Sequence, residues 1–140
     1  QSNTLTSDIA NDVVLLGDEE RLRRMTAILL DNAMKYSGEG GAVTLRLQKL
    51  QEKAVLTVHN TGDQIPADQI PHIFERFYRV DSSRTRAQGG YGLGLAIAQS
   101  SVHDHHGKIH AQSDTQCTTF TVALPMCTQR TIKYKKKVTK

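Results

Sequence analysis

The chain of 140 residues is long enough for one domain with its own core, and none of its apolar runs approaches the roughly 20 residues of a membrane-spanning helix. Its net charge of +4 comes from a tail: six of the 18 basic residues lie within 130–140, which holds no acid, and the remainder carries 12 basic against 14 acidic side chains. We expect this basic tail to be solvated rather than bound to nucleic acid or lipid, and the two cysteines, Cys117 and Cys127, lack a disulfide-framework pattern and fit a reducing compartment.

The sequence predicts short strands and helices in a mixed order. In chain order these are strands at 4–9 and 13–16, a helix at 19–36, strands at 42–48 and 54–59, a turn at 60–66, a short helix at 67–74, a polar lid at 80–88, a glycine-rich loop at 89–94, a helix at 93–105, and strands at 108–112 and 119–124. Asp18 is a favourable N-cap for the first helix, and alternating side chains predict an antiparallel hairpin from the third and fourth strands. The order lacks repeated βαβ units and predicts an α+β fold with helices on one face of a mixed sheet.

The predicted helix over 19–36 carries a polar residue in the middle of its apolar stripe. At about 100° per residue, Asn32 lies near the centre of that stripe, between Ile28 and Tyr36, with Lys35 at the edge. A buried amide needs hydrogen-bond partners. Two interpretations stay open: an amide satisfied by nearby backbone, or an amide aimed at a ligand or a metal-bound oxygen.

The densest signal is the glycine-rich loop, since four of the ten glycines fall within residues 89–94. Glycines let backbone N–H groups approach a bulky group closely, and the start of a helix attracts an anion. The loop therefore predicts either a phosphate-binding segment or a hinge before a buried helix. It is neither a P-loop nor a dinucleotide fingerprint, because its spacing is GGxGxG after a polar loop.

Other polar and aromatic residues are weaker candidates. Asn60 can present its amide into a cleft or make an Asx turn, and Arg79 can reach a phosphate. The aromatic residues of 74–78 are expected to be core anchors. The histidines at 103, 105, 106 and 110 do not have the spacing of a zinc site, and both cysteines are expected to be ordinary small residues.

Four segments resemble the named boxes of sensor histidine kinases. Residues 29–37 (LLDNAMKYS) look like the N box, 60–66 (NTGDQIP) the G1 box, 73–79 (IFERFYR) the F box and 90–97 (GYGLGLAI) the G2 box. They follow the family's order and spacing, so the chain resembles the catalytic and ATP-binding domain of these kinases, in the GHKL-type ATPase superfamily. The resemblance implies a two-layer α/β sandwich, with three helices on one face of a mixed, mostly antiparallel sheet.

The resemblance also implies cofactors, which are ATP and Mg²⁺, and residue roles. Asn32 would coordinate Mg²⁺, Lys35 would contact the phosphates and Arg79 the γ-phosphate, which makes these three the catalytic candidates. Tyr36 would stack near adenine, and Asn60 and Thr118 would lie beside it. The further nucleotide contacts implied are Gly62, Ile65, Phe77, Tyr78, Gly90, Tyr91, Gly92, Leu93, Gly94 and Leu95.

The sequence departs from the family pattern at four positions. Asn60 replaces the usual aspartate, which predicts modest ATP affinity, because a neutral acceptor is weaker than a charged one. Gln64 and Cys117 replace glycines and would tighten the purine pocket. Ile28 replaces an asparagine and can neither bind Mg²⁺ nor take a proton, which argues against vigorous ATP hydrolysis.

We divide the chain into an N-terminal tail at 1–7 that contains the start of the first strand, an ATP-binding catalytic domain at 8–126 and a basic tail at 127–140. No segment like His-Glu-Leu-Arg-Thr-Pro precedes the N box. The resemblance therefore implies an excised cytoplasmic domain that cannot autophosphorylate alone. Its partners would be a histidine on a separate dimerisation domain and a response regulator, within a membrane-anchored homodimer and without nucleic acid.

Two alternatives to the kinase hypothesis remain. Ile28 and the altered G1 box fit a nucleotide-binding module that has lost catalysis and acts through ATP-dependent conformational change. A nucleic-acid-linked ATPase of the same superfamily would use the basic tail, but Ile28 and the F box disfavour it.

Overall fold

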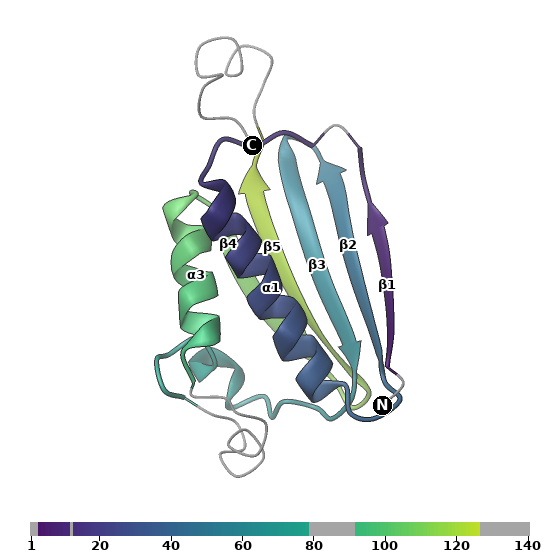
Figure 1. Ribbon diagram of the computed structural model, residues 1–140. Helices are drawn as coiled ribbons and strands as arrows, with labels where there is room; N and C mark the ends of the chain where they lie inside the picture. Colours follow the sequence, from purple (N-terminus) through teal and green to yellow (C-terminus); the bar gives the residue numbers. More distant parts are fainter. Residues whose placement is uncertain (1–2, 12, 79–91, 127–140) are drawn as a thin grey trace.

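The computed structural model describes residues 3–11, 13–78 and 92–126. Its elements are β1 (Thr4–Ile9), α1 (Glu19–Tyr36), β2 (Ala42–Leu50), β3 (Lys53–Thr61), the 3₁₀ turn η1 (Ile70–His72), α3 (Gly94–Asp104), β4 (Lys108–Ser113) and β5 (Cys117–Pro125). Figure 1 shows a five-stranded sheet with α1 and α3 side by side on one of its faces. The predicted α+β sandwich is thereby confirmed.

The sheet has the strand order β1-β2-β3-β5-β4 and is mixed. β1 runs parallel to β2, and α1 makes the connection between them, while the other three neighbouring pairs are antiparallel. The predicted hairpin is β2–β3, and both strands are longer than the alternation indicated. β3 includes Asn60, which pairs with Thr118 of β5, so both side chains lie within the sheet and not in turns.

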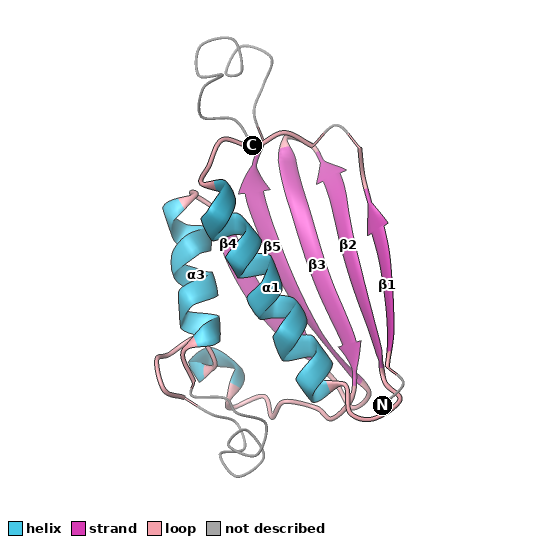
Figure 2. Cartoon of the chain, in the orientation of Figure 1, coloured by secondary structure: helices cyan, strands magenta, loops and turns pink. Residues whose placement is uncertain are grey.

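The core lies between the sheet and the two helices. Residues Met25, Leu29 and Ala33 of α1 recur at helical spacing and are buried, and they meet the alternate residues of β3 and β5 that face the helices. Phe74 packs its ring edge-on against Phe120, with ring centroids 6.0 Å apart. The two helices thus pack on one face of the sheet (Figure 2), whereas all six residues of β1 at its edge are exposed.

One histidine joins the two helices at the end opposite the predicted site. The Nε2 atom of His105 accepts a hydrogen bond from the backbone N–H of Asp18 (2.9 Å), and its Nδ1 donates to the carbonyl of Ser101 (2.7 Å). Asp18 caps α1 by accepting from the N–H of Arg21. His105 therefore ties the start of α1 to the end of α3.

Two predicted elements are wrong. Residues 67–74 form only the 3₁₀ turn η1, because Pro66 and Pro71 lack the N–H groups of a continuing α-helix. The described residues therefore contain two α-helices, not three. Residues 13–16 form no strand beyond an isolated bridge at Leu16, and Leu15 packs on the core instead.

Of the helices in the described ranges, none is long and apolar enough to cross a bilayer.

Candidate functional site

The predicted site segments meet at one end of the sandwich. The end of α1, the end of β3, the start of β5 and the start of α3 all lie at the lower end of the molecule in Figure 1, together with residues 62–78. Side chains from segments far apart in the sequence can therefore share one site. The lid at 80–88, Arg79, Gly90 and Tyr91 lie outside the described residues.

Asn60 holds the most unusual polar atom of this end. Its side chain is 1% exposed, and its Nδ2 donates to the main-chain oxygen of Thr61 (3.0 Å). Its Oδ1 is buried without any hydrogen-bond partner in the described part of the chain. Such an orphan acceptor costs roughly 1–3 kcal/mol, so it points to a donor supplied by a ligand. The Asx turn that the sequence left open is not formed by this amide.

A hydroxyl pair lies beside Asn60. Thr118, its cross-strand partner, is 3% exposed and shares a hydrogen bond of 2.7 Å with the hydroxyl of Ser113. That hydroxyl accepts from the N–H of Ile65 (2.8 Å), which ties the G1 segment to the β4–β5 hairpin. The sequence pattern pointed to Thr118 and Ile65 but not to Ser113, since no motif marks a serine at a strand end.

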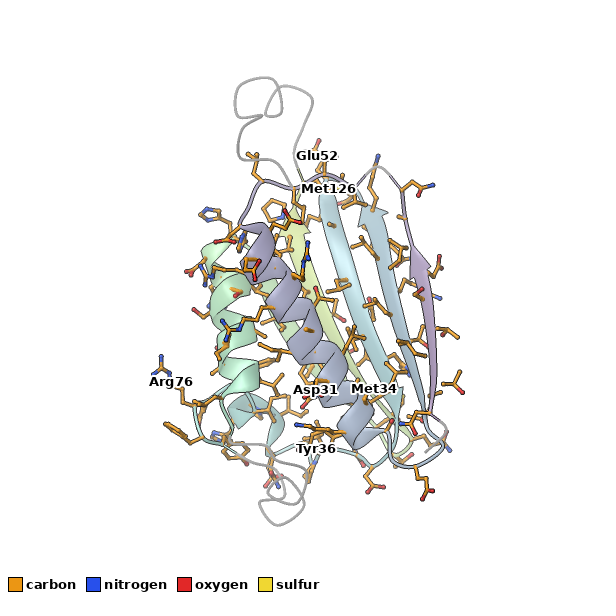
Figure 3. All side chains as sticks on the ribbon, viewed as in Figure 1. Asp31, Met34, Tyr36, Glu52, Arg76 and Met126 are labelled. Atoms are coloured by element: carbon orange, nitrogen blue, oxygen red, sulfur yellow. The ribbon has the colours of Figure 1, made fainter. Side chains whose placement is uncertain are left out.

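Gly62 brings the G1 segment against the end of α1. It has φ +143°, and a Cβ atom there would overlap the main-chain oxygen of Tyr36. Its N–H donates to the carbonyl of Gln116 (3.0 Å). Any side chain at this position would push the end of α1 away from the G1 segment, so Gly62 is needed for close packing. Figure 3 shows Tyr36 at the lower end of α1, on the side of this site.

The last turns of α1 supply the polar residues of the N box. Lys35 pairs with Asp31 at 3.2 Å, and its side chain is 33% exposed. Asn32 is half-buried, and within the described residues its amide makes no hydrogen bond to backbone. The structure thus gives no support to an Asn32 satisfied by its own helix. Ile28, one turn earlier, packs on the core instead of facing solvent.

The F and G2 segments are joined at their ends. The N–H of Phe77 donates to the carbonyl of Gly92 (2.6 Å). Gly92 has φ +78°, and a Cβ atom there would lie 2.7 Å from the Cα of Phe77. Phe77 itself has φ +67° and is 69% exposed, so it is not the core anchor that the sequence predicted. Tyr78 is half-buried and donates to Gln69 (3.0 Å).

Gly94 is the first residue of α3. Its lack of a side chain allows α3 to pack closely on α1 and leaves the backbone at the start of the helix accessible. A Cβ atom there would lie 3.3 Å from Cγ2 of Ile28, so a larger residue would crowd α1. No side chain caps the start of α3, which leaves its first N–H groups without that partner. Leu95 packs on the core, whereas the side chain of Leu93 is 37% exposed on the outer side of α3.

The β4–β5 turn closes this end with one acid and one thiol. Hydrogen bonds from the backbone N–H of Gln116, and then from the thiol and N–H of Cys117, lower the pKa of the Asp114 carboxyl. Burial, followed by the hydrogen bond and charge of Asp114, raises the pKa of the Cys117 thiol. The thiolate form of Cys117 is therefore disfavoured, and its thiol and N–H help to hold the turn through Asp114.

The chain matches a family model described as "Histidine kinase-, DNA gyrase B-, and HSP90-like ATPase" over residues 17–128. The chain belongs to this family of ATPases. The sensor histidine kinase RppB of Synechocystis sp. is 42% identical to this ATPase domain over 124 residues, which cover 87% of the chain and 27% of RppB.

Solved structures resemble the ATPase domain along most of its length. A mycobacterial sensor histidine kinase, MprB, has 31% identity and a TM-score of 0.79, with 89% of this chain and 84% of that chain covered. Full-length ShkA in complex with AMPPNP has 26% identity and a TM-score of 0.76, with 91% and 26% covered. The ATPase domain spans 18% to 32% of the length of the curated relatives, which are sensor kinases.

Proposed function

We propose that this ATPase domain binds Mg·ATP at the end of the sandwich where the four boxes meet. The observation that carries the proposal is the buried Oδ1 of Asn60, which has no partner among the described residues. The bond from Nδ2 to Thr61 holds the amide with its oxygen as the free acceptor. An exocyclic amino group, as on adenine, is the donor that such an acceptor selects. The AMPPNP bound by the related ShkA supports the nucleotide class.

The surroundings of Asn60 suit a purine ring. Ile65 is 7% exposed and supplies apolar surface, and the Thr118 hydroxyl offers a polar contact. The main chain of Tyr36 lies against Gly62, which brings the end of α1 to the G1 segment. A flat ring between these groups would be largely removed from water, as nucleotide sites require.

The phosphates would lie toward α3 and the N box. The uncapped start of α3 offers backbone N–H groups and a partial positive charge to an anion. Lys35 adds a cationic side chain from α1, and the half-buried amide of Asn32 is a suitable oxygen ligand for Mg²⁺. The metal, when bound, would neutralise phosphate charge, while the residues of the chain hold the nucleotide in place.

We further propose that the bound ATP is presented to a histidine on a separate dimerisation domain. The relatives RppB and MprB are sensor histidine kinases, and this chain covers 27% of RppB. Ile28 fits transfer better than hydrolysis, because an isoleucine packed on the core cannot activate water. We also propose that the full-length protein is a membrane-anchored homodimer and that a response regulator is its partner.

Calorimetry with ATP, with and without Mg²⁺, tests the nucleotide site. We expect Asn60→Ala to weaken ATP binding about tenfold, which corresponds to the roughly 1.4 kcal/mol of one hydrogen bond. We expect Asn32→Ala to remove the Mg²⁺ dependence. Gln48→Ala, an exposed change on β2 far from this end, is the control. Failure of the unchanged domain to bind ATP would refute the site.

Mixing the domain with its own histidine-bearing domain and Mg·ATP tests the transfer. Phosphohistidine should form at a rate proportional to the bound ATP. Binding without any transfer would favour the second candidate, a module that acts through ATP-dependent conformational change. The observation that favours this second candidate is Ile28, which leaves Mg²⁺ with one side-chain ligand fewer.

A further inference from the structure

The amide of Asn3, the residue directly before β1, holds the loop that follows α1. Its Nδ2 donates to the hydroxyl of Ser37 (2.8 Å), and its Oδ1 accepts from the backbone N–H of Gly40 (3.1 Å). These two partners are 34 and 37 positions away in the sequence. Both polar ends of one side chain are therefore bonded to a single loop. We call this arrangement the Asn3 clamp.

Ser37 is the contact through which the clamp reaches α1. It is the C-cap of the helix and is only 6% exposed. Its N–H donates to the carbonyl of Ala33 (2.9 Å), and its hydroxyl donates to the carbonyl of Met34 (3.0 Å). The hydroxyl thus pairs a carbonyl of the last turn that lacks a partner inside the helix, while it accepts from Asn3. The clamp therefore fixes the last turn of α1 as well as the loop.

The loop over 38–41 needs a contact from outside to be fixed. Gly38 and Gly40 both have φ +75° and open space where a side chain would lie. Glycines lose more conformational freedom on ordering than other residues. Backbone bonds join Gly41 to Gly38 (3.2 Å) and Thr4 to Gly41 (3.0 Å). The amide of Asn3 adds a side-chain link from the start of β1 to this glycine-rich segment.

The turn that the clamp holds carries the N-box side chains of the proposed nucleotide site. Lys35 and Tyr36 directly precede Ser37 in the chain. Asn32 lies about one turn earlier on α1. The main-chain oxygen of Tyr36 lies against Gly62, where the G1 segment packs closely. A shift of this turn would move all three N-box side chains together, relative to the rest of the site.

We propose that Asn3 is a positioning residue for nucleotide binding, which acts through Ser37 and Gly40 by holding the last turn of α1 in its binding geometry. The inference rests on the proposed nucleotide site. It goes beyond that site because Asn3 lies in none of the four boxes and is not among the residues placed against the nucleotide. When the clamp opens, the apparent affinity for Mg·ATP falls with the fraction of molecules that keep the binding geometry. By linkage, bound Mg·ATP keeps the clamp closed.

Calorimetry with Mg·ATP tests the effect of the clamp on affinity. We expect Asn3→Ala to weaken binding about fivefold, the scale of one hydrogen bond. Ser37→Ala should have a similar effect. The double variant should lose little more than either single variant, because both changes break the same link.

Thr6→Ala is the matched control for these variants. It removes a hydroxyl of β1 that meets the hydroxyl of Thr44 on β2 (3.3 Å). Thr44 follows the buried Val43 in β2 and so lies on the face of the sheet away from the helices. Thr6→Ala should therefore leave the affinity for Mg·ATP unchanged. Circular dichroism checks that each variant is folded.

Hydrogen exchange of the Gly40 amide measures the clamp directly, because this N–H must leave the Oδ1 of Asn3 before it exchanges. In the unchanged domain, Mg·ATP at about ten times its Kd should slow this exchange about tenfold. The N–H of Met126 is the control amide, since it donates to Glu52 at the opposite end of the molecule (Figure 3). Its exchange should not respond to Mg·ATP. In Asn3→Ala, Gly40 should exchange faster than in the unchanged domain.

The inference fails if Asn3→Ala binds Mg·ATP as tightly as the unchanged domain, even with a lower melting temperature, because Asn3 would then serve folding alone. It also fails if Thr6→Ala weakens binding as much as Asn3→Ala does. An unchanged Gly40 exchange rate in Mg·ATP would overturn it without the need for any variant to fold. Failure of the proposed function is a different result, in which the unchanged domain binds no Mg·ATP at all and the clamp has no nucleotide to position.

Discussion

The neighbour of Asn60 sets which atom of its amide is free. Nδ2 donates to the oxygen of Thr61, so Oδ1 is left buried without a described partner. An aspartate has no donor to offer Thr61, so Asn60→Asp would bury a carboxylate beside a carbonyl oxygen. Burial without a partner disfavours the charged form and raises the pKa of this carboxyl.

The pH dependence of the stability of Asn60→Asp follows from this raised pKa. The folded pKa would lie above the unfolded value of about 3.9, so the variant matches the wild type best at low pH and loses stability as pH rises. We expect urea unfolding to show a loss of roughly 1–3 kcal/mol at pH 8 and a smaller loss at pH 5. Saturating ATP should reduce the loss of stability relative to the wild type, because a charged acceptor binds an amino group more strongly. An equal loss at both pH values would contradict the buried-acceptor geometry.

The thiol of Cys117 gives a second test at the residue scale. Burial and Asp114 raise its pKa, so the reactive thiolate is scarce at neutral pH. In a Cys127→Ser background, we expect Asp114→Ala to speed alkylation of Cys117 by iodoacetamide roughly threefold to tenfold. Asp68→Ala, an exposed acid in another turn, is the control. Equal rates in all three proteins would show that Asp114 does not govern the thiol.

At the scale of elements, one glycine holds the F and G2 segments together. Gly92 needs its positive φ, and a side chain there would collide with Phe77. We expect Gly92→Ala to cost about 2–4 kcal/mol, from strain and overpacking together. Gly38→Ala is the matched control, since Gly38 has φ +75° but open space around it, and should cost only about 1 kcal/mol.

Urea unfolding and ATP calorimetry on both glycine variants separate strain from contact. Both variants share the cost of the left-handed backbone, so the difference between them measures the collision with Phe77. We expect only Gly92→Ala to weaken ATP binding. Equal losses of stability would mean that the contact between the two segments contributes nothing.

Element boundaries show where sequence patterns are weakest. The helix α1 was predicted at its observed bounds, because a cap, acids in the first turn and an apolar stripe all agree. The helix predicted at 67–74 failed, since its apolar spacing competed with two prolines. The strands β3 and β5 run past their predicted ends, because sheet pairing continues through polar residues such as Asn60 and Thr118.

At the scale of the whole molecule, we expect removal of the two chain ends to have different effects on stability. β1 begins at Thr4 and pairs with β2 along its length, and the N–H of Met126 donates to Glu52 after the last strand. Removing residues 1–9 should therefore lower the melting temperature by more than 5 °C, roughly the effect of 1–2 kcal/mol. Removing 127–140 should shift it by less than 2 °C, about the scale of a surface change. A large loss from the second truncation would move the domain boundary into the tail.

The sequence by itself determined the family and the fold class of this protein. Four boxes in order predicted an α+β sandwich of this ATPase family, and their positions pointed to Asn32, Asn60 and Thr118 as residues of the site. Local rules suffice for the helices and the glycine loop, because caps, periodicity and glycine spacing are properties of neighbouring residues. The choice of site residues came from the resemblance of the four boxes to those of sensor histidine kinases.

Tertiary structure alone decided how those residues are placed and which of their atoms are paired. That Oδ1 of Asn60 is the orphan atom depends on Thr61, and the Ser113 hydroxyl reaches Ile65 only because β4 and β5 pair. A hollow between α1 and α3 is lined by Arg21 and Arg24 and by Leu93 and Ile97, which are about seventy positions away in the sequence. Burial and long-range contact are set by the packing of helices on the sheet, and no local pattern in the chain encodes them.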